Sequence, residues 1–312
     1  MEVLVARQVK GSFLTKLKKQ KSLLLAVLPS VVIVLIFNYL PIYGIIAAFQ
    51  DFDIIDGYFR SPFVGIKHFQ LLVNTPEFWG VLGYTLKITV LRIIVGLVVP
   101  VTFALLLNEL RNQIFKRVIQ TISYLPHFLS WVIVAGMIYK FLDSEGPLNN
   151  LMKFLFNRES IQYLADPKYF IPIIIVSGLW KEVGYNAIVY IAALAAIDPQ
   201  LYEAGKIDGA GRWKLTWHVT LPGIVPTMVM LFILSIGGLM AVGFDQVWNM
   251  QNSLIQNDTH VLDTYIYTQG IRMANYSFGI AAGLFQGIIS LILLITTNHV
   301  SQKVSDIGIY KA

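Results

Sequence analysis

The sequence predicts an all-α membrane protein with six transmembrane helices and both termini in the cytoplasm. Hydrophobic residues make up 56% of the chain and charged residues 13%, whereas soluble domains have about 45–50% apolar and about 25% charged residues. The apolar residues also gather in six long runs, each long enough to cross the hydrocarbon core as a helix. Finally, lysine and arginine are distributed unevenly between the connecting segments, which indicates the orientation of the chain.

The six apolar runs predict the membrane helices in order. They extend over about residues 23–49, 81–107, 119–142, 169–195, 222–244 and 276–298. Each run is continuously apolar rather than alternating, which favours helices over the strands of a membrane barrel. The first run is too long for the core of a signal peptide and has no small-residue cleavage site, so we expect it to remain as a helix.

Basic residues predict the orientation of these helices. With the N-terminus inside, the inner segments contain Arg7, Lys10, Lys16, Lys18, Lys19, Lys21, Arg111, Lys116, Arg117, Lys206, Arg212, Lys214, Lys303 and Lys311. The outer segments contain the smaller set Arg60, Lys67, Lys140, Lys153, Arg158, Lys168 and Arg272. This asymmetry satisfies the positive-inside rule. The net charge of +6 therefore reflects topology and attraction to anionic lipid rather than nucleic-acid binding.

The chain has no long linker, no low-complexity tract and no obvious internal repeat, which indicates one membrane domain over about residues 23–298. A basic cytoplasmic arm, residues 1–22, precedes it, and a cytoplasmic tail, residues 299–312, follows. The arm is either an amphipathic helix on the inner leaflet or a solvated basic tail.

The outer connectors near 50–80, 143–168 and 245–275 are longer than the cytoplasmic connector 108–118, and their acidic residues outnumber their basic ones. This predicts that a substantial surface is presented outside the membrane.

The connector 198–222 is the most polar segment between two apolar runs, and it predicts a short cytoplasmic helix. Asp198 is a helix-capping residue, and Pro199 suits the first helical position. The helix then continues through "QLYEAGKI" and ends near Gly209 and Gly211, because glycine tolerates the left-handed turn that ends a helix. Pro222 is expected in the first turn of the next membrane helix, where a missing N–H costs least.

Small residues and carboxylates occur together on this short helix and its end. The set comprises Glu203, Ala204, Gly205, Asp208, Gly209 and Ala210. Small residues permit close approach of another backbone, and the charges specify its register. A protein-docking surface and a merely tight, well-capped loop both fit this pattern.

The order Glu-Ala-Gly at 203–205, Asp-Gly-Ala at 208–210 and prolines at 222 and 226 resembles the EAA loop of bacterial ABC importer membrane subunits. In that family the loop forms a coupling helix, between the fourth and fifth membrane helices, that sits in a groove of the cytoplasmic ATPase. The resemblance implies that Glu203, Ala204, Gly205, Asp208, Gly209 and Ala210 contact the ATPase. The family usually has alanine where this chain has Gly205, a change that leaves docking intact and loosens the helix.

Further motifs resemble the permeases of the carbohydrate-uptake class. These are "PFVGIKHFQLL" at 62–72 and "PEFWGVLGYTL" at 76–86. The stretches "YLPHFLSWVIVAGMIY" at 124–139 and "GPLNN" at 146–150 are similar to the subgroup that imports oligosaccharides and polysaccharides, including aldouronate- and alginate-type systems. The resemblance implies an ABC importer permease fold in the bacterial inner membrane. It also implies three partners, namely a second and different permease, an ATPase dimer and an extracytoplasmic solute-binding protein.

The chain is not expected to be an enzyme. No G-x-x-x-x-G-K-[ST] phosphate loop occurs, because the Gly205-Lys206 pair has Gln200 five residues before the glycine. ATP and Mg²⁺ are therefore expected on the partner ATPase, and no cofactor on this chain. The absence of cysteine excludes disulfides and thiol chemistry, and the five histidines show no metal-ligand spacing.

Two other classes remain to be weighed against an importer subunit. An ion-coupled secondary sugar transporter would need an inverted repeat and a buried acidic relay, of which only Glu182 is present. A membrane-embedded enzyme would need a nucleophile–base pair or a metal constellation inside the spans.

Polar residues inside the apolar runs are the candidates for a substrate path, because charge in lipid is costly. The candidates are Arg92, Trp180, Lys181, Glu182, Tyr185, Asn186, Tyr190, Asp245, Gln246, Trp248 and Asn249. Aromatic faces stack on sugars and amides bind hydroxyl groups. Arg92 or Lys181 would bind the carboxylate of a uronate. Interhelical contacts and interfacial anchoring are the alternative roles for these residues.

Two expectations concern the charged side chains of the runs. Because Lys181 and Glu182 are adjacent, their side chains are expected to diverge on the helix without neutralising each other. Lys87, like Arg92, is expected to face a cavity or a partner.

Overall fold

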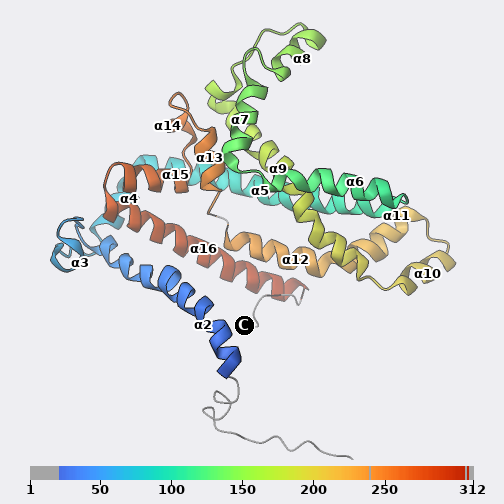
Figure 1. Ribbon diagram of the computed structural model, residues 1–312, viewed down its shortest axis with the longest axis horizontal. Helices are drawn as coiled ribbons and strands as arrows, with labels where there is room; N and C mark the ends of the chain where they lie inside the picture. The colour runs from blue at the N-terminus through green and yellow to red at the C-terminus, as the bar shows by residue number, and fades with distance from the viewer. Residues whose placement is uncertain (1–20, 239, 306–307, 309–312) are drawn as a thin grey trace, which may run out of the picture. The chain divides into compact units, whose positions relative to one another are not determined.

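The computed structural model describes residues 21–238, 240–305 and 308, and this part of the chain is helical, with one isolated antiparallel bridge between Gln50 and Phe63 (Figure 1). The chain divides into two compact units, Met1–Ile66 and Lys67–Ala312. Almost all of the predicted basic arm, residues 1–22, lies outside the described residues. In the predicted tail, residues 299–312, positions 306–307 and 309–312 also lie outside them.

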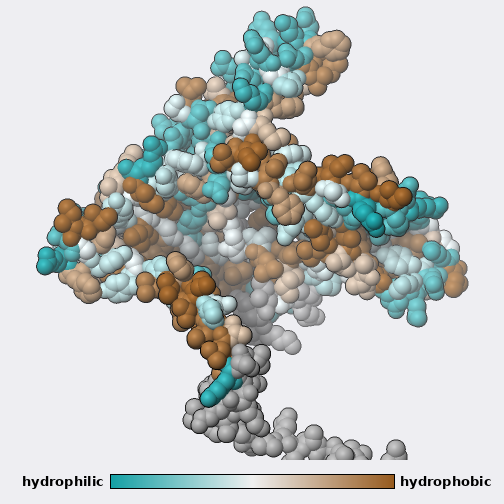
Figure 2. Space-filling view, in the orientation of Figure 1, coloured by the Kyte–Doolittle hydropathy of each residue, from teal (hydrophilic) through white to brown (hydrophobic). Residues whose placement is uncertain are grey.

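The first unit contains one long apolar helix, Leu24–Phe49, which agrees with the first predicted run. It consists of α2 (Lys21–Val34), a wide π-helical turn η1 (Leu35–Tyr39) and a tighter helix η2 (Leu40–Phe49), followed by the short α3 (Gly57–Arg60). The π-helical turn precedes Pro41, whose ring crowds the preceding turn and whose missing N–H removes one hydrogen bond of a regular helix. The most apolar part of this helix has no buried residue, and Figure 2 shows apolar surface along α2.

The second unit is built around four long helices. They are α5 (Pro76–Glu109), α9 (Pro167–Ala195), α12 (Leu221–Gly237) and α16 (Tyr276–Ser305). α5 packs against α9, α9 against α12, and α12 against α16 (Figure 1). Buried apolar side chains fill these contacts, among them Ala104, Ala187 and Ile224 at one end and Ile88 and Ile174 at the other.

Shorter elements complete the second unit. They are α4 (Lys67–Asn74), α6 (Gln113–Tyr124), η3 (Leu125–Phe128), α7 (Trp131–Leu142), α8 (Pro147–Phe156), η4 (Tyr163–Ala165), α10 (Pro199–Ile207), α11 (Arg212–Leu215), η5 (Thr216–Thr220), α13 (Phe244–Met250), α14 (Gln256–Thr259), α15 (Leu262–Ile266) and η6 (Tyr267–Arg272).

The third predicted run, 119–142, is not one straight helix. The segments Gln113–Phe128 and Trp131–Phe156 meet at an angle of 104°. Pro126 lies in the tight turn η3 before the bend, and Ser130 starts the next helix by accepting a hydrogen bond from the Ile133 N–H at 3.4 Å. The sequence did not predict this bend, because the apolar character of a run does not indicate where the backbone changes direction.

The described residues contain four helices that are long and apolar enough to cross a membrane, or up to five if the bent pair is one span. α9 has the required length, 29 residues, but is not one of the apolar spans, since Lys181, Glu182 and Asn186 lie in its middle. These helices account for most of the six predicted runs.

The fifth predicted run begins earlier than expected. Pro222 lies in the first turn of α12, as predicted, but α11 and η5 precede α12 without a break, which makes one continuous helix over Arg212–Gly237. The π-helical turn Thr216–Thr220 allows the helix to continue past Pro222. The Leu221 N–H donates to the Thr216 carbonyl, and the wider turn leaves space for the ring of Pro222. The helix also ends at Gly237, before the predicted end at 244.

Candidate functional site

The predicted coupling helix is α10. Asp198 caps it by accepting a hydrogen bond from the Gln200 N–H at 2.9 Å, and Pro199 occupies the first turn. The helix ends as expected at Gly209, which has a φ of +76°, and the Ala210 N–H donates to the Gly205 carbonyl at 2.9 Å. Gly211 is not part of this left-handed turn, since its φ is −74° and it precedes α11.

The structure brings the six coupling residues together on α10 and its terminal turn, but it does not expose them equally. Glu203, Ala204, Asp208 and Gly209 are exposed. Gly205 is half-buried against α11, where an added Cβ would lie 2.7 Å from the Leu215 Cδ2 atom. Gly205 therefore contributes to the packing of the segment as well as to its surface.

Apolar side chains on the same segment are exposed. Ile207 is 87% exposed and Trp213 79% exposed, and Leu201 also lies on the surface. Exposed apolar side chains of this size are available for a protein contact. These residues were not among the sequence candidates, although isolated large apolar residues in an otherwise polar connector were a signal for them.

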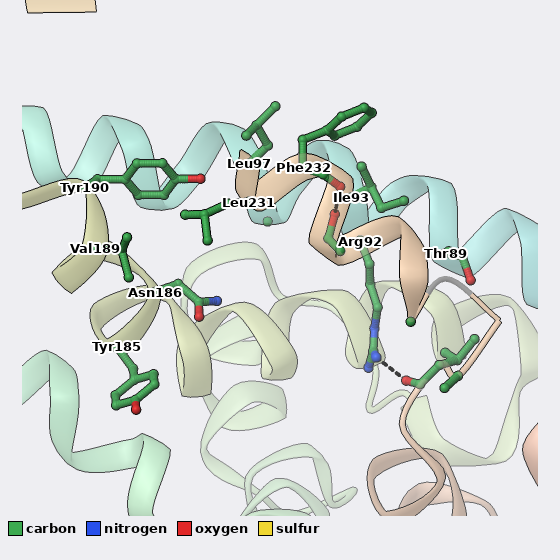
Figure 3. Close-up of a pocket in the computed structure, with 15 residues that line it drawn as sticks. Thr89, Arg92, Ile93, Leu97, Tyr185, Asn186, Val189, Tyr190, Leu231 and Phe232 are labelled. Carbon is green, nitrogen blue, oxygen red and sulfur yellow. Dashed lines mark hydrogen bonds between the residues drawn. The ribbon is translucent and has the colours of Figure 1, made fainter. Parts of the chain in front are cut away.

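Two adjoining cavities lie among α5, α9, α12 and the start of α13, with volumes of about 340 and 290 Å³. Arg92, Gly96 and Asn186 line both cavities. Figure 3 shows Arg92 extending from α5, with Tyr185, Asn186 and Tyr190 on the neighbouring α9. Tyr185 and Tyr190 line the first cavity, and Glu182 and Gln246 the second.

The guanidinium group of Arg92 connects α5 to the segment that follows α12. It donates hydrogen bonds to the Val242 carbonyl (Figure 3) and to the Gln246 Oε1 atom. The Gln246 amide nitrogen in turn donates to the Ile174 carbonyl at 2.7 Å and to the Ser177 hydroxyl at 2.9 Å. The cavity wall is thus a hydrogen-bonded network of three segments.

Lys181 and Glu182 do not diverge, contrary to expectation. The Lys181 ammonium lies 3.4 Å from one Glu182 oxygen and donates to the His127 carbonyl at 2.5 Å. The other Glu182 oxygen lies 2.7 Å from the His127 Nδ1 atom. The long side chains fold toward the same partner, the bend between α6 and α7, and Lys181 is only 5% exposed.

His127 is a residue that the sequence analysis missed. Its ring also stacks on Tyr185, with 3.7 Å between the ring centroids and parallel planes. The available signal was the one histidine inside the apolar run 119–142.

The remaining path candidates lie elsewhere. Trp180 lines a separate apolar cavity of about 640 Å³, and Trp248 packs on Phe244 with 5.5 Å between the ring centroids. Asp245 is exposed, and Asn249 donates to the Asp245 carbonyl at 2.7 Å. None of these side chains lines either of the cavities that contain Arg92.

Lys87 is exposed and likewise lines neither cavity. The described residues contain no cluster of side chains suited to hold a metal ion.

Comparisons with known proteins agree with this architecture. Residues 93–306 match the family described as "Binding-protein-dependent transport system inner membrane component". The polygalacturonan/rhamnogalacturonan transport system permease protein YteP of Bacillus subtilis (strain 168) is 40% identical over 308 residues, which cover 99% of this chain and 96% of that protein. The arabinooligosaccharides permease AraP of the same organism is 30% identical over 282 residues, or 89% and 86% of the two chains.

A solved structure is similar over its whole length. The crystal structure of a bacterial ABC transporter involved in import of the acidic polysaccharide alginate contains a chain that is 34% identical, with a TM-score of 0.87, covering 95% of this chain and 100% of that chain. A second structure of a bacterial alginate ABC transporter, in complex with a periplasmic protein that holds an alginate pentasaccharide, matches with a TM-score of 0.88.

These findings confirm the ABC permease fold, the inner-membrane location and the similarity to sugar transport permeases. They do not favour the ion-coupled alternative, since the similarity to ABC transport permeases covers nearly the whole chain. The chain belongs to the family of inner membrane components of binding-protein-dependent transport systems.

Proposed function

We propose that this chain forms one half of the membrane pathway of an ATP-driven importer of oligosaccharides or polysaccharides, including uronates. The observation that carries the proposal is the full-length similarity to permeases named for polygalacturonan and alginate. The two cavities that contain Arg92 support it, because their largely apolar walls present aromatic, amide and guanidinium groups at one place inside a membrane domain.

We retain the predicted topology, in which the chain crosses the membrane six times and both termini lie in the cytoplasm. The count is reached when the bent pair of segments is one crossing and α9 is another. A helix of 29 residues is about 43 Å long at 1.5 Å per residue, which exceeds the hydrocarbon thickness of roughly 30 Å. The polar middle of α9 would then face the cavities and the α6–α7 bend instead of lipid.

In this proposal α10 docks onto a separate ATPase subunit through Glu203, Ala204, Asp208 and Gly209, with the apolar Ile207 beside them. ATP and Mg²⁺ bind to an ATPase dimer, whose closure moves α10 and converts the membrane domain from an inward-open to an outward-open state. A second, homologous permease completes the path, and a solute-binding protein delivers the saccharide to the outer connectors.

The test is purification of the tagged chain from its native membrane, followed by identification of the proteins that copurify and by transport assays in proteoliposomes. We expect an ATPase, a second permease, and ATP hydrolysis that rises when a saccharide and its binding protein are added. Recovery of this chain alone, active in sugar uptake without ATP, would overturn the proposal.

A further inference from the structure

Arg92 differs from Glu182, the other charged residue of the cavity walls, in having no charged partner among the described residues. Within the described part of the chain it forms no ion pair, and its two hydrogen bonds go to the neutral oxygens of Val242 and Gln246. A guanidinium group has five N–H donors, so most of its donors are left for another acceptor. Charge inside a membrane domain is costly, and an ionisable group kept there indicates a functional role.

The neighbouring charges are already satisfied. Glu182 binds Lys181 through one carboxylate oxygen and His127 through the other. Asp263, on α15, accepts hydrogen bonds from the Gln286 side chain at 2.8 Å and from the backbone N–H groups of Val242 and Gly243. Neither carboxylate contacts Arg92, which leaves one positive charge facing the two cavities.

The surroundings of Arg92 leave space for a ligand. Gly243 has a φ of +91°, and a Cβ added there would lie 3.3 Å from one terminal nitrogen of Arg92. A Cβ added at Gly178 would lie 3.8 Å from the other terminal nitrogen. Two glycines therefore lie close to the guanidinium group, and Arg92 lines both cavities.

The segment that Arg92 holds is a junction between helices. Residues 240–243, here called the α12–α13 turn, are bound by Arg92 from α5, by Asp263 from α15 and by Gln286 from α16, which donates to the Met240 carbonyl at 2.9 Å. Gln286 and Asp263 hold the turn independently of Arg92. The bonds made by Arg92 can therefore be exchanged without releasing the turn from α15 and α16.

We propose that Arg92 selects carboxylate-bearing saccharides by exchanging its neutral ligands, the Val242 carbonyl and the Gln246 amide oxygen, for a carboxylate of the substrate. A carboxylate accepts two parallel hydrogen bonds from a guanidinium group, which a neutral hydroxyl group cannot do. The inference rests on the proposed saccharide import and adds the residue that distinguishes acidic from neutral chains.

The experiment uses the complete transporter in proteoliposomes, with the same wild-type binding protein in every assay. Uptake of a short oligogalacturonate is compared with uptake of the same oligomer in partially methyl-esterified form. Because the binding protein is constant, a change in the ratio of the two uptake rates between variants originates in this chain. The variants are Arg92→Gln, Arg92→Lys and Asn186→Asp, with Lys87→Gln as the matched control, since it removes a positive charge from the same helix outside both cavities.

We expect Arg92→Gln to lower uptake of the acidic oligomer by about tenfold or more, the factor that corresponds to loss of a charge-assisted hydrogen bond, and to change uptake of the esterified oligomer much less. For Arg92→Lys we expect an intermediate loss of acidic-oligomer uptake, because lysine keeps the positive charge but lacks the planar guanidinium group. Asn186→Asp adds a negative charge to both cavities and should also disfavour the acidic oligomer, while Lys87→Gln should match the wild type.

An equal loss of both substrates in Arg92→Gln would overturn the inference, because Arg92 would then only hold the α12–α13 turn. If this variant does not assemble with the other subunits, the near-isosteric Asn186→Asp decides by the same ratio, and an unchanged ratio there contradicts the inference. A wild-type complex that imports neither oligomer with ATP would overturn the saccharide function itself.

Discussion

Glu203 is exposed on the short helix α10. Its replacement therefore tests contact with another protein without disturbing the fold. Neighbouring Gly205 behaves differently, because it lies against Leu215. Among residues of the same motif, exposure thus separates those available to a partner from those that hold the segment together.

We predict that Glu203→Lys abolishes ATP-driven uptake and leaves the yield and thermal stability of the membrane subunit unchanged. Charge reversal at a protein contact brings like charges together or leaves the partner's charge unpaired, which costs several kcal/mol. The measurements are uptake in proteoliposomes and copurification of the ATPase. Glu109→Lys is the control, since it makes the same charge change at the exposed end of α5; normal uptake by Glu203→Lys would remove the docking role.

Tyr185 and Trp180 are both half-exposed aromatic residues of α9, but they line different cavities. We predict that Tyr185→Ala lowers saccharide uptake by roughly fivefold, the loss expected for an aromatic stacking contact of about 1 kcal/mol, while Trp180→Ala does not. Tyr185→Phe keeps the ring that stacks on His127 and should retain most uptake. Equal uptake by Tyr185→Ala and the wild type would assign Tyr185 to packing on His127.

At the scale of elements, close backbone contacts decide which helices are neighbours. A Cβ at Gly184 would lie 2.2 Å from the Ser123 carbonyl, so α6 and α9 meet there backbone to backbone. Gly279 of α16 meets Gly270 of η6 in the same way, whereas Gly283 and Gly287 have nothing within 4 Å in the described chain. The Gly-x-x-x-Gly spacing of α16 therefore marks a smooth face that this chain covers only at one end.

We predict that Gly184→Ala lowers the thermal stability of the purified complex, because the added methyl group must displace backbone atoms of α6. Overpacking of this kind costs about 1–3 kcal/mol. Gly136→Ala, on α7, is the matched control, since nothing lies within 4 Å of a Cβ added there. The measurement is a thermal denaturation curve in detergent, and equal midpoints for the two variants would contradict the contact between α6 and α9.

For the whole molecule, the arrangement of helices places the first cavity between α5, α9 and α12, while the α10 segment follows the end of α9. We propose that a movement of α10 reaches the cavity walls through α9 and through the continuous helix Arg212–Gly237, because these two helices precede and follow the α10 segment and both line the first cavity. Coupling at a distance requires such rigid, continuous elements.

We predict that a cysteine at position 206 is labelled only from the cytoplasmic side and a cysteine at position 158 only from the outside. The chain contains no cysteine, so Lys206→Cys and Arg158→Cys each provide a single thiol, and both native side chains are exposed. Membrane-impermeant maleimide applied to intact and to permeabilised cells provides the measurement. Labelling of both positions from the same side would contradict the six-span topology.

The residue pattern was enough to recognise a helical membrane protein, its long apolar helices, the capped helix α10 and its end at Gly209, because hydropathy and capping depend on neighbours in the sequence. The polar residues Arg92, Asn186 and Gln246 could also be singled out, since polar groups inside apolar runs are costly wherever they point. Three-dimensional packing was needed to join Lys181 and Glu182 to His127, to place Trp180 and Trp248 outside the two cavities that contain Arg92, and to bend the third run. Those outcomes depend on contacts between residues far apart in the chain, and no local pattern encodes which distant group a long side chain will reach.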